Sequence, residues 1–250
     1  MQELSAGRLT VVIPVYNEAA TLHAAIARLR KSPTPEGWER RIIAVDDGST
    51  DGSAELLDEL AAQANDMMVV RHPRNMGKGS ALRTGLKHAD GDVVLIHDAD
   101  LEYDPRDHLE VLAPILEGRA DAVIGSRFRG GTSHRVLYFW HSVANRGLTS
   151  FSNALTNLNL SDIECCTKVF TKEVAARLAL REPGFGVEPE IVAKLARMRL
   201  DVGAKGWRRL RIYEAPVSYA GRTYAEGKKI KWTDGLWAAW CILRYSLGPL

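Results

Sequence analysis

The sequence predicts a single α/β domain built on a mostly parallel β-sheet with helices on both faces. Short runs rich in β-branched residues alternate with helical stretches of about ten residues, which is the pattern of βαβ units. A length of 250 residues can bury a sizeable core, and 46% hydrophobic with 26% charged residues is typical of a globular protein. No repeat, low-complexity tract or linker divides residues 1–250, which we therefore treat as one domain.

The first half of the chain alternates regularly between strand and helix patterns. The strands are rich in Val and Ile, and the helices carry their apolar residues on one stripe. In chain order they are strand 8–16, helix 21–31, strand 40–47, helix 52–63, strand 67–72, helix 79–89, strand 91–98, helix 108–118 and strand 120–127. Thr50 or Asp51 is the expected cap of helix 52–63, and Pro114 is a weak point of helix 108–118.

The rhythm changes after residue 128. A long aromatic segment predicts a helix over 135–155, and the later patterns predict a strand at 166–171, a helix at 188–199 and a strand at 210–219. The domain therefore has a regular part, residues 8–130, and a variable part, residues 131–232, before a C-terminal amphipathic helix, residues 233–250.

The predicted C-terminal helix places four large apolar residues at helical spacing, namely Leu236, Trp240, Leu243 and Leu247. This helix either packs on the core or lies in a membrane interface beside the basic segment that precedes it. Twelve Lys and Arg stand against four Asp and Glu from residue 194 onward, although the net charge of the chain is only +2. The asymmetry indicates an anionic partner for this part, with a solvated basic face as the alternative.

Cellular location is constrained by what the sequence does not contain. The first residues lack a basic region followed by a long apolar core, and no uncharged run approaches the roughly 20 residues of a spanning helix. The three cysteines, Cys165, Cys166 and Cys241, have neither zinc nor CxxC spacing. We therefore expect a protein of the reducing cytoplasm that does not cross a membrane by itself.

Polar clusters follow four of the predicted strands. They read VYNEA (15–19), DDGSTDGS (46–53), PRNMGKGSA (73–81) and DADLE (98–102). Ligands of open α/β sheets bind at the carboxyl ends of the strands. A single such cluster is explained by a capped turn, whereas four at one edge indicate a binding site.

The acidic cluster after strand 91–98 has the chemistry of a metal site. Asp98 and Asp100 are two residues apart, so their side chains share a face of an extended segment. Crowded carboxylates repel one another unless a cation holds them, and oxygen ligands suit Mg²⁺ or Mn²⁺ bound to substrate phosphates. The alternative, an acidic first turn of the next helix, explains Asp104 and Asp107 but not this pair.

The turn after strand 67–72 supplies Gly77 and Gly79 with Lys78 between them. Its backbone N–H groups and the following helix N-terminus suit phosphate or ribose oxygens, although a glycine turn without a ligand is the alternative. The spacing matches neither a Walker A loop nor GxGxxG. One of the consecutive aspartates Asp46 and Asp47 is expected to accept hydrogen bonds from a base or a ribose hydroxyl.

Five segments together resemble the family 2 glycosyltransferases of the GT-A fold. They are VVIPVYNEAATL, IIAVDDGSTDGS, RNMGKGSALRTGL, GDVVLIHDADLEYDP and VIGSRF, in this order. The resemblance is closest to the branch of dolichyl- and polyprenyl-phosphate mannose and glucose synthases. It covers residues 8–130 with high specificity and extends less specifically to residues 160–170, 184–191 and 219–232.

The resemblance implies a set of site residues. It makes residues 8–130 the nucleotide-sugar-binding half and residues 131–232 the acceptor half. The implied nucleotide-sugar contacts are Pro14, Tyr16, Glu18, Asp46, Asp47, Gly77, Lys78, Asp98 and Ala99. Asp98 and Asp100 match the DxD pair that holds a divalent cation, and Glu102 stands at a further metal-facing position where some relatives have Gln. Arg127 matches an arginine near the phosphates, and we count Asp100 and Arg127 among the catalytic residues.

The implied reaction is transfer from a nucleotide sugar with inversion at the anomeric carbon, assisted by Mg²⁺ or Mn²⁺ as Lewis acid. A lipid phosphate acceptor is already anionic and needs no general base, whereas a hydroxyl acceptor needs one. Asp162, Glu164 and Glu188 are the candidates for that base, with an acidic first helical turn as the alternative for Glu188.

The basic segment near residue 225 is the expected binding site of an acceptor phosphate. It contains Arg222, Lys228 and Lys229, and a basic surface loop is the alternative. We thus expect a UDP- or GDP-sugar donor and a polyprenyl-phosphate acceptor at the cytoplasmic face of a membrane, without nucleic acid. The alternatives are a soluble hydroxyl or glycan acceptor, a sugar nucleotidyltransferase, and a non-catalytic sugar-nucleotide-binding module. The sequence predicts neither the nucleotide base nor the oligomeric state.

Overall fold

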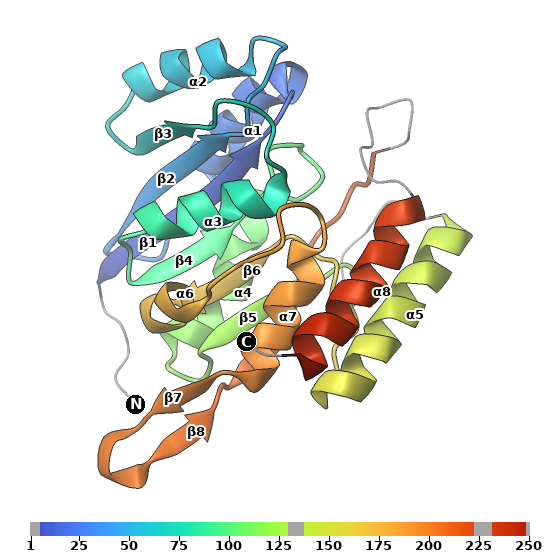
Figure 1. Ribbon diagram of the computed structural model, residues 1–250. Helices are drawn as coiled ribbons and strands as arrows, with labels where there is room; N and C mark the ends of the chain where they lie inside the picture. The colour runs from blue at the N-terminus through green and yellow to red at the C-terminus, as the bar shows by residue number, and fades with distance from the viewer. Residues whose placement is uncertain (1–5, 130–137, 223–231, 249–250) are drawn as a thin grey trace.

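The computed structural model describes residues 6–129, 138–222 and 232–248 (Figure 1). Its centre is a seven-stranded sheet in the order β3-β2-β1-β4-β6-β5-β9, in which only β6 runs antiparallel to its neighbours. The strands are β1 Gly7–Val15, β2 Trp38–Asp46, β3 Met67–Arg71, β4 Val93–Ile96, β5 Ala122–Ser126, β6 Lys168–Thr171 and β9 Ile212–Pro216. The predicted mostly parallel sheet is confirmed.

Helices cover both faces of this sheet, as predicted. They are α1 Ala19–Lys31, α2 Ser53–Ala62, α3 Lys78–His88, α4 His108–Leu116, α5 Phe139–Thr156, α6 Lys172–Arg177, α7 Val187–Arg197 and α8 Trp232–Leu247. In Figure 1, α3 and α6 lie in front of the sheet and α1 and α4 lie behind it. The strand residues between these layers form one large buried core.

Short elements and one helix start differ from the sequence prediction. The six-residue helix α6 and the hairpin of β7 Arg199–Asp201 and β8 Trp207–Arg209 were not predicted, because they are too short to show a period. Helix α2 begins after Gly52 rather than after Thr50 or Asp51. The Asp51 carboxylate still accepts the N–H of Ser53, 3.0 Å away. It therefore satisfies one of the unpaired N–H groups at the start of the helix, although it lies one residue before the N-cap position.

Strand register brings the polar clusters to one edge of the sheet. Val15, Asp46 and Arg71 are register partners across β1, β2 and β3, so the chain leaves these three strands at the same level. Strand β4 ends at Ile96, opposite Val12, and the residues after it continue toward the same edge.

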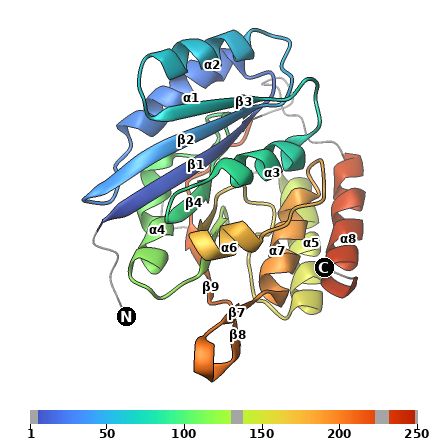
Figure 2. The ribbon, with the colours of Figure 1, turned by 60° about the vertical axis from the view of Figure 1, so that its left-hand side comes forward.

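The second part of the chain adds a helical layer beside this edge. Helices α5 and α8 lie side by side, and α7 packs against both (Figures 1 and 2). Among the helices that the structure describes, none combines the length and apolar character needed to cross a membrane. A single β-bridge between Tyr103 and Tyr219 brings the start of the basic segment against the acidic cluster. Lys228 and Lys229 lie outside the described residues.

Candidate functional site

A cavity of about 680 Å³ opens at the carboxyl edge of the sheet. One side of it is lined by residues at the end of β1 and just after β1, β2, β3 and β4, namely Pro14, Tyr16, Glu18, Asp47, Gly77, Lys78, Asp98, Ala99, Asp100 and Glu102. Arg127, Glu164, Glu188 and Arg222 line the rest together with residues of α5 and α8. The fold thus brings most of the sequence-predicted site residues to one cavity. Asp46 and Asp162 lie behind its wall.

The two consecutive aspartates after β2 organise backbone turns. Asp47 is 2% exposed and accepts the N–H groups of Met76 and Gly77 at 2.9 and 2.7 Å. Its Oδ1 also lies 2.7 Å from Nδ1 of His72. Asp46 accepts the N–H of Ser49 at 3.1 Å. Asp47 therefore fixes the glycine turn, and Asp46 fixes the turn after its own strand.

The acidic cluster after β4 is paired with two cations. Lys78 Nζ donates to Asp98 at 3.0 Å, and the Arg222 guanidinium lies 2.9 Å from Asp100. Arg222 also pairs with Glu18 at 3.1 Å, and its backbone N–H donates to Glu102 at 2.7 Å. One lysine and one arginine thus neutralise carboxylates from two separate segments, the one after β1 and the one after β4.

Crowding separates the acidities of the two aspartates. Burial, followed by the negative charges of Asp98 and Glu102, raises the pKa of Asp100 to about 7. Burial would also raise the pKa of Asp98, but the Lys78 ammonium, the Cys166 thiol and His97 together outweigh it and leave that pKa below its ordinary value. Within the described ranges no three His, Cys, Asp or Glu side chains form a metal-holding group. The donor set nevertheless fits a hard divalent cation, because Asp98, Asp100 and Glu102 supply carboxylate oxygens to one cavity wall.

The floor of the cavity is a buried charge cluster. Glu188 is 3% exposed, lies 2.9 Å from Nζ of Lys78 and also pairs with Lys168, which is fully buried. Burial and the Glu188 carboxylate raise the pKa of Glu164 to about 7. Oε1 of Glu164 has no hydrogen-bond partner among the described residues. Glu188 is therefore held between two ammonium groups, while Glu164 retains a free carboxyl oxygen.

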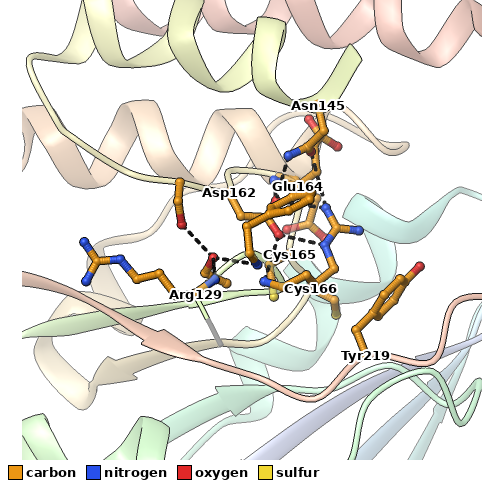
Figure 3. A network of polar contacts seen from close by, with 12 residues as sticks. Arg129, Asn145, Asp162, Glu164, Cys165, Cys166 and Tyr219 are labelled. Atoms are coloured by element: carbon orange, nitrogen blue, oxygen red, sulfur yellow. Dashed lines mark hydrogen bonds and ion pairs between the residues drawn. The ribbon is translucent and has the colours of Figure 1, made fainter. Parts of the chain in front are cut away.

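Asp162 binds Arg127 and is not among the residues that line the cavity. Figure 3 shows the polar network that contains Asp162 and Asn145. The Arg127 guanidinium donates to both carboxylate oxygens of Asp162 at 2.7 and 2.8 Å, and Asn145 from α5 donates to the same carboxylate at 3.3 Å. Asp162 is fully buried, and Arg127 lies over the ring of Tyr219 at 5.1 Å. This bidentate pair fixes the orientation of a cavity-lining guanidinium.

Several lining residues were not identified from the sequence. They come mainly from the helical layer and include Trp140, His141, Asn145, Phe185, Asp234 and Ala238. The signal that could have found two of them is the i, i+4 spacing of His141 and Asn145, which places both on one face of the predicted helix.

An exposed apolar face borders the cavity on the side of α5 and α8. From α5 it includes Phe139 and Trp140, which are 69% and 76% exposed. From α8 it includes the predicted stripe Leu236, Trp240, Leu243 and Leu247 together with Trp237, all between 39% and 65% exposed. We call these seven residues the apolar face. The stripe itself is exposed, whereas the opposite face of α8 packs on the core through Cys241, Ile242 and Tyr245.

Sequence comparison identifies a family and several relatives. The sequence model described as glycosyl transferase family 2 matches residues 10–178. The undecaprenyl-phosphate 4-deoxy-4-formamido-L-arabinose transferase of Proteus mirabilis is 30% identical over 223 residues. That of Aeromonas hydrophila subsp. hydrophila is 27% identical over 221 residues. Each alignment covers 88% of this chain, and the chain spans 62% of the length of each relative.

Structural comparison finds the same fold in glucosyl-3-phosphoglycerate synthase from Mycobacterium tuberculosis. Its complex with UDP superposes with a TM-score of 0.68 at 20% identity and covers 99% of this chain and 83% of that one. Its complex with Mn²⁺, UDP-glucose and phosphoglyceric acid gives 0.67 at 21% identity, with 99% and 82% covered. At this identity the likeness establishes a common fold, which is GT-A.

Proposed function

The chain belongs to glycosyl transferase family 2, and we propose that it transfers a hexose from a UDP- or GDP-linked donor to a polyprenyl-phosphate-type acceptor with inversion. The observation that carries this proposal is one cavity that joins a carboxylate cluster, buried cations and an exposed apolar face. The names of the bacterial relatives, which refer to undecaprenyl phosphate, support the choice of acceptor.

The donor lies at the ends of β1 to β4 in this proposal. Pro14, Tyr16, Asp47, Gly77 and Ala99 contact the nucleotide sugar, with Glu18 and Lys78 beside them and Asp46 supporting the turn behind. Asp98 and Asp100, with Glu102, hold Mg²⁺ or Mn²⁺, which when bound neutralises charge developing on the leaving diphosphate. Arg127, oriented by Asp162, faces the phosphates and adds fixed positive charge at the same place.

The ion pairs of the acceptor side favour an acceptor that needs no general base. Asp162 is bound to a guanidinium, and Glu188 is bound to two ammonium groups, so neither carboxylate is placed to take a proton from a hydroxyl. A phosphate acceptor is already anionic, and its oxygen attacks directly once it is positioned. We assign Arg222 to the acceptor phosphate, together with Lys228 and Lys229 from outside the described residues.

A hydroxyl acceptor is the second candidate, and one residue supports it. Glu164 lines the cavity, has a free buried oxygen and a pKa of about 7, which suits a general base near neutral pH. Activity on a soluble hydroxyl compound that is lost in Glu164→Gln would favour this candidate over the lipid phosphate.

The apolar face is proposed to rest on the cytoplasmic surface of a membrane. Its tryptophans and leucines are exposed beside the cavity mouth, where a polyprenyl chain must emerge. Aromatic and apolar side chains next to cations are the composition of interfacial helices. This placement lets the lipid tail remain in the bilayer while its phosphate enters the cavity.

The proposal is tested by incubating the purified protein with Mn²⁺ or Mg²⁺, a panel of UDP- and GDP-sugars, and either a short polyprenyl phosphate or soluble acceptors. We expect one donor to yield a lipid-linked sugar and the corresponding nucleoside diphosphate. Transfer to soluble acceptors alone would select the second candidate. Release of pyrophosphate, or no turnover with any donor, would contradict both.

A further inference from the structure

The segment of residues 182–188 lies between α8 and the glycine turn that we assign to the donor. On one side it contacts the turn of residues 77–80, and on the other it contacts the inner face of α8. The proposed function uses the turn but assigns no role to this segment or to Glu182. The buried carboxylate of Glu182 contacts α8, and the backbone of the same segment contacts the glycine turn.

The side chain of Glu182 is directed at α8. It is 2% exposed, and its oxygens accept the Tyr245 hydroxyl at 2.6 Å and the Trp237 indole N–H at 3.0 Å. The guanidinium of Arg244 lies 3.5 Å from the same carboxylate. A buried carboxylate is stable only while such donors satisfy it. Glu182 therefore holds α8 at points two helical turns apart.

The backbone at Glu182 and Pro183 is directed at the glycine turn. The carbonyl of Pro183 accepts the N–H of Ser80 at 3.0 Å. A Cβ on Gly79 would lie 2.1 Å from the carbonyl oxygen of Glu182, and one on Gly77 would lie 2.4 Å from that of Pro183. Because only glycine allows this approach, the turn and the segment are in direct backbone contact.

Contacts with α7, and contacts at residues 186–188, also hold the segment in place. Glu190, fully buried, accepts the N–H groups of Arg181 and Glu182 at 2.7 and 2.8 Å. A Cβ on Gly186 would lie 2.6 Å from Sγ of Cys241 in α8. Two residues later, Glu188 pairs with Lys78 of the turn at 2.9 Å. The segment therefore has little freedom to move without moving the turn.

We propose that Glu182 is a positioning residue through which α8 sets the geometry of the donor-binding turn at residues 77–80. The position of α8 then controls how Gly77 and Lys78 contact the donor. The inference rests on the proposed donor role of the turn. The effect of α8 on the turn of residues 77–80 can nevertheless be measured without any ligand.

The test compares wild type with Tyr245→Phe and Trp237→Phe, which each remove one donor to Glu182 and keep an aromatic ring. Hydrogen exchange of the peptide spanning residues 77–82 is measured without ligand, well below the melting temperature of every variant. Donor Kd is measured calorimetrically with Mn²⁺ and the sugar nucleotide that the wild type binds best. Glu173→Gln, an exposed change on α6, is the control.

We expect the Ser80 amide to exchange roughly five- to tenfold faster in both variants, as follows from loss of one hydrogen bond to a buried carboxylate. Donor Kd should rise by a similar factor, with acceptor KM unchanged and the control at wild-type values. Unchanged exchange in this peptide, or faster exchange with unchanged donor Kd, would overturn the inference. Absence of donor binding by the wild type would instead contradict the proposed function and leave the exchange result to decide the connection.

Discussion

The two parts of this molecule build their shares of the cavity in different ways. Residues 8–130 present site residues on short segments that directly follow parallel strands, so neighbouring strands alone bring them together. The described residues between 138 and 248 deliver theirs from helices and loops that are distant in sequence. Ion pairs hold them in place, either within this part, as in Lys168–Glu188, or to the first part, as in Asp162–Arg127. The first part depends on backbone register and the second on paired charges. Substitutions should therefore affect chemistry in the first part and stability in the second.

The largest effect is expected from Asp100→Ala in the first part. Removal of a metal ligand should lower transfer by roughly 1,000-fold or more and abolish metal-dependent donor binding, because charge on the leaving diphosphate is no longer neutralised. Calorimetric titration of the sugar nucleotide with Mn²⁺ measures it. Asp104→Asn is the matched control, since Asp104 pairs with the exposed Arg106 and is not among the residues that line the cavity. Equal losses of transfer and donor binding in both variants would contradict the assignment of Asp100 as a metal ligand.

The second prediction concerns Asp162→Asn in the second part. This change leaves the Arg127 guanidinium buried without its carboxylate, so we expect the free energy of unfolding to fall by about 3–5 kcal/mol. Urea unfolding followed by circular dichroism measures it. Glu117→Gln breaks the exposed pair with Arg119 and should cost less than about 1 kcal/mol. A loss of unfolding free energy in Asp162→Asn as small as that in Glu117→Gln would show that the second part does not depend on its paired charges.

The third prediction uses the pKa of Glu164. Since this pKa rises to about 7 in the folded protein, the folded state binds the proton more tightly than the unfolded state does. The contribution of Glu164 to stability should therefore be lost as pH rises from about 4.5 to 7, by up to about 3 kcal/mol. The difference in melting temperature between Glu164→Gln and wild type should grow in favour of the variant over this range. A pH-independent difference would contradict the assignment.

The smallest expected effect concerns the apolar face. Leu243→Ser and Leu247→Ser together should weaken binding to vesicles containing anionic lipid by roughly tenfold, because each removes exposed apolar surface from the membrane contact. Donor binding should remain unchanged. Leu109→Ser, on α4 away from this face and 38% exposed, serves as the control in a sedimentation assay. Equal vesicle binding by wild type, the double variant and the control would exclude α8 as the contact.

The difference between the two parts also explains which elements and contacts could be predicted from the sequence. The strands and helices of residues 8–130 were predicted within a few residues, because their hydrophobic periods and the polar strand ends are local signals. The partners of Asp162 and Glu188 could not be predicted, since Arg127 and Lys168 reach them only after distant segments pack. Glu182 gave no local signal either, because its role depends on Trp237 and Tyr245, which lie more than 50 residues further along the chain.

The central claim is an inverting, metal-dependent transfer to a phosphate acceptor, and the anomeric configuration of the product tests it most directly. The protein is incubated with Mn²⁺, the preferred α-linked sugar nucleotide and a short polyprenyl phosphate, and the product is examined by ¹H and ³¹P NMR. We predict a sugar joined through its anomeric carbon to the lipid phosphate in the β configuration, and no product when EDTA removes the metal. An α-linked product, a sugar attached to a hydroxyl, or equal yield in EDTA would contradict the account.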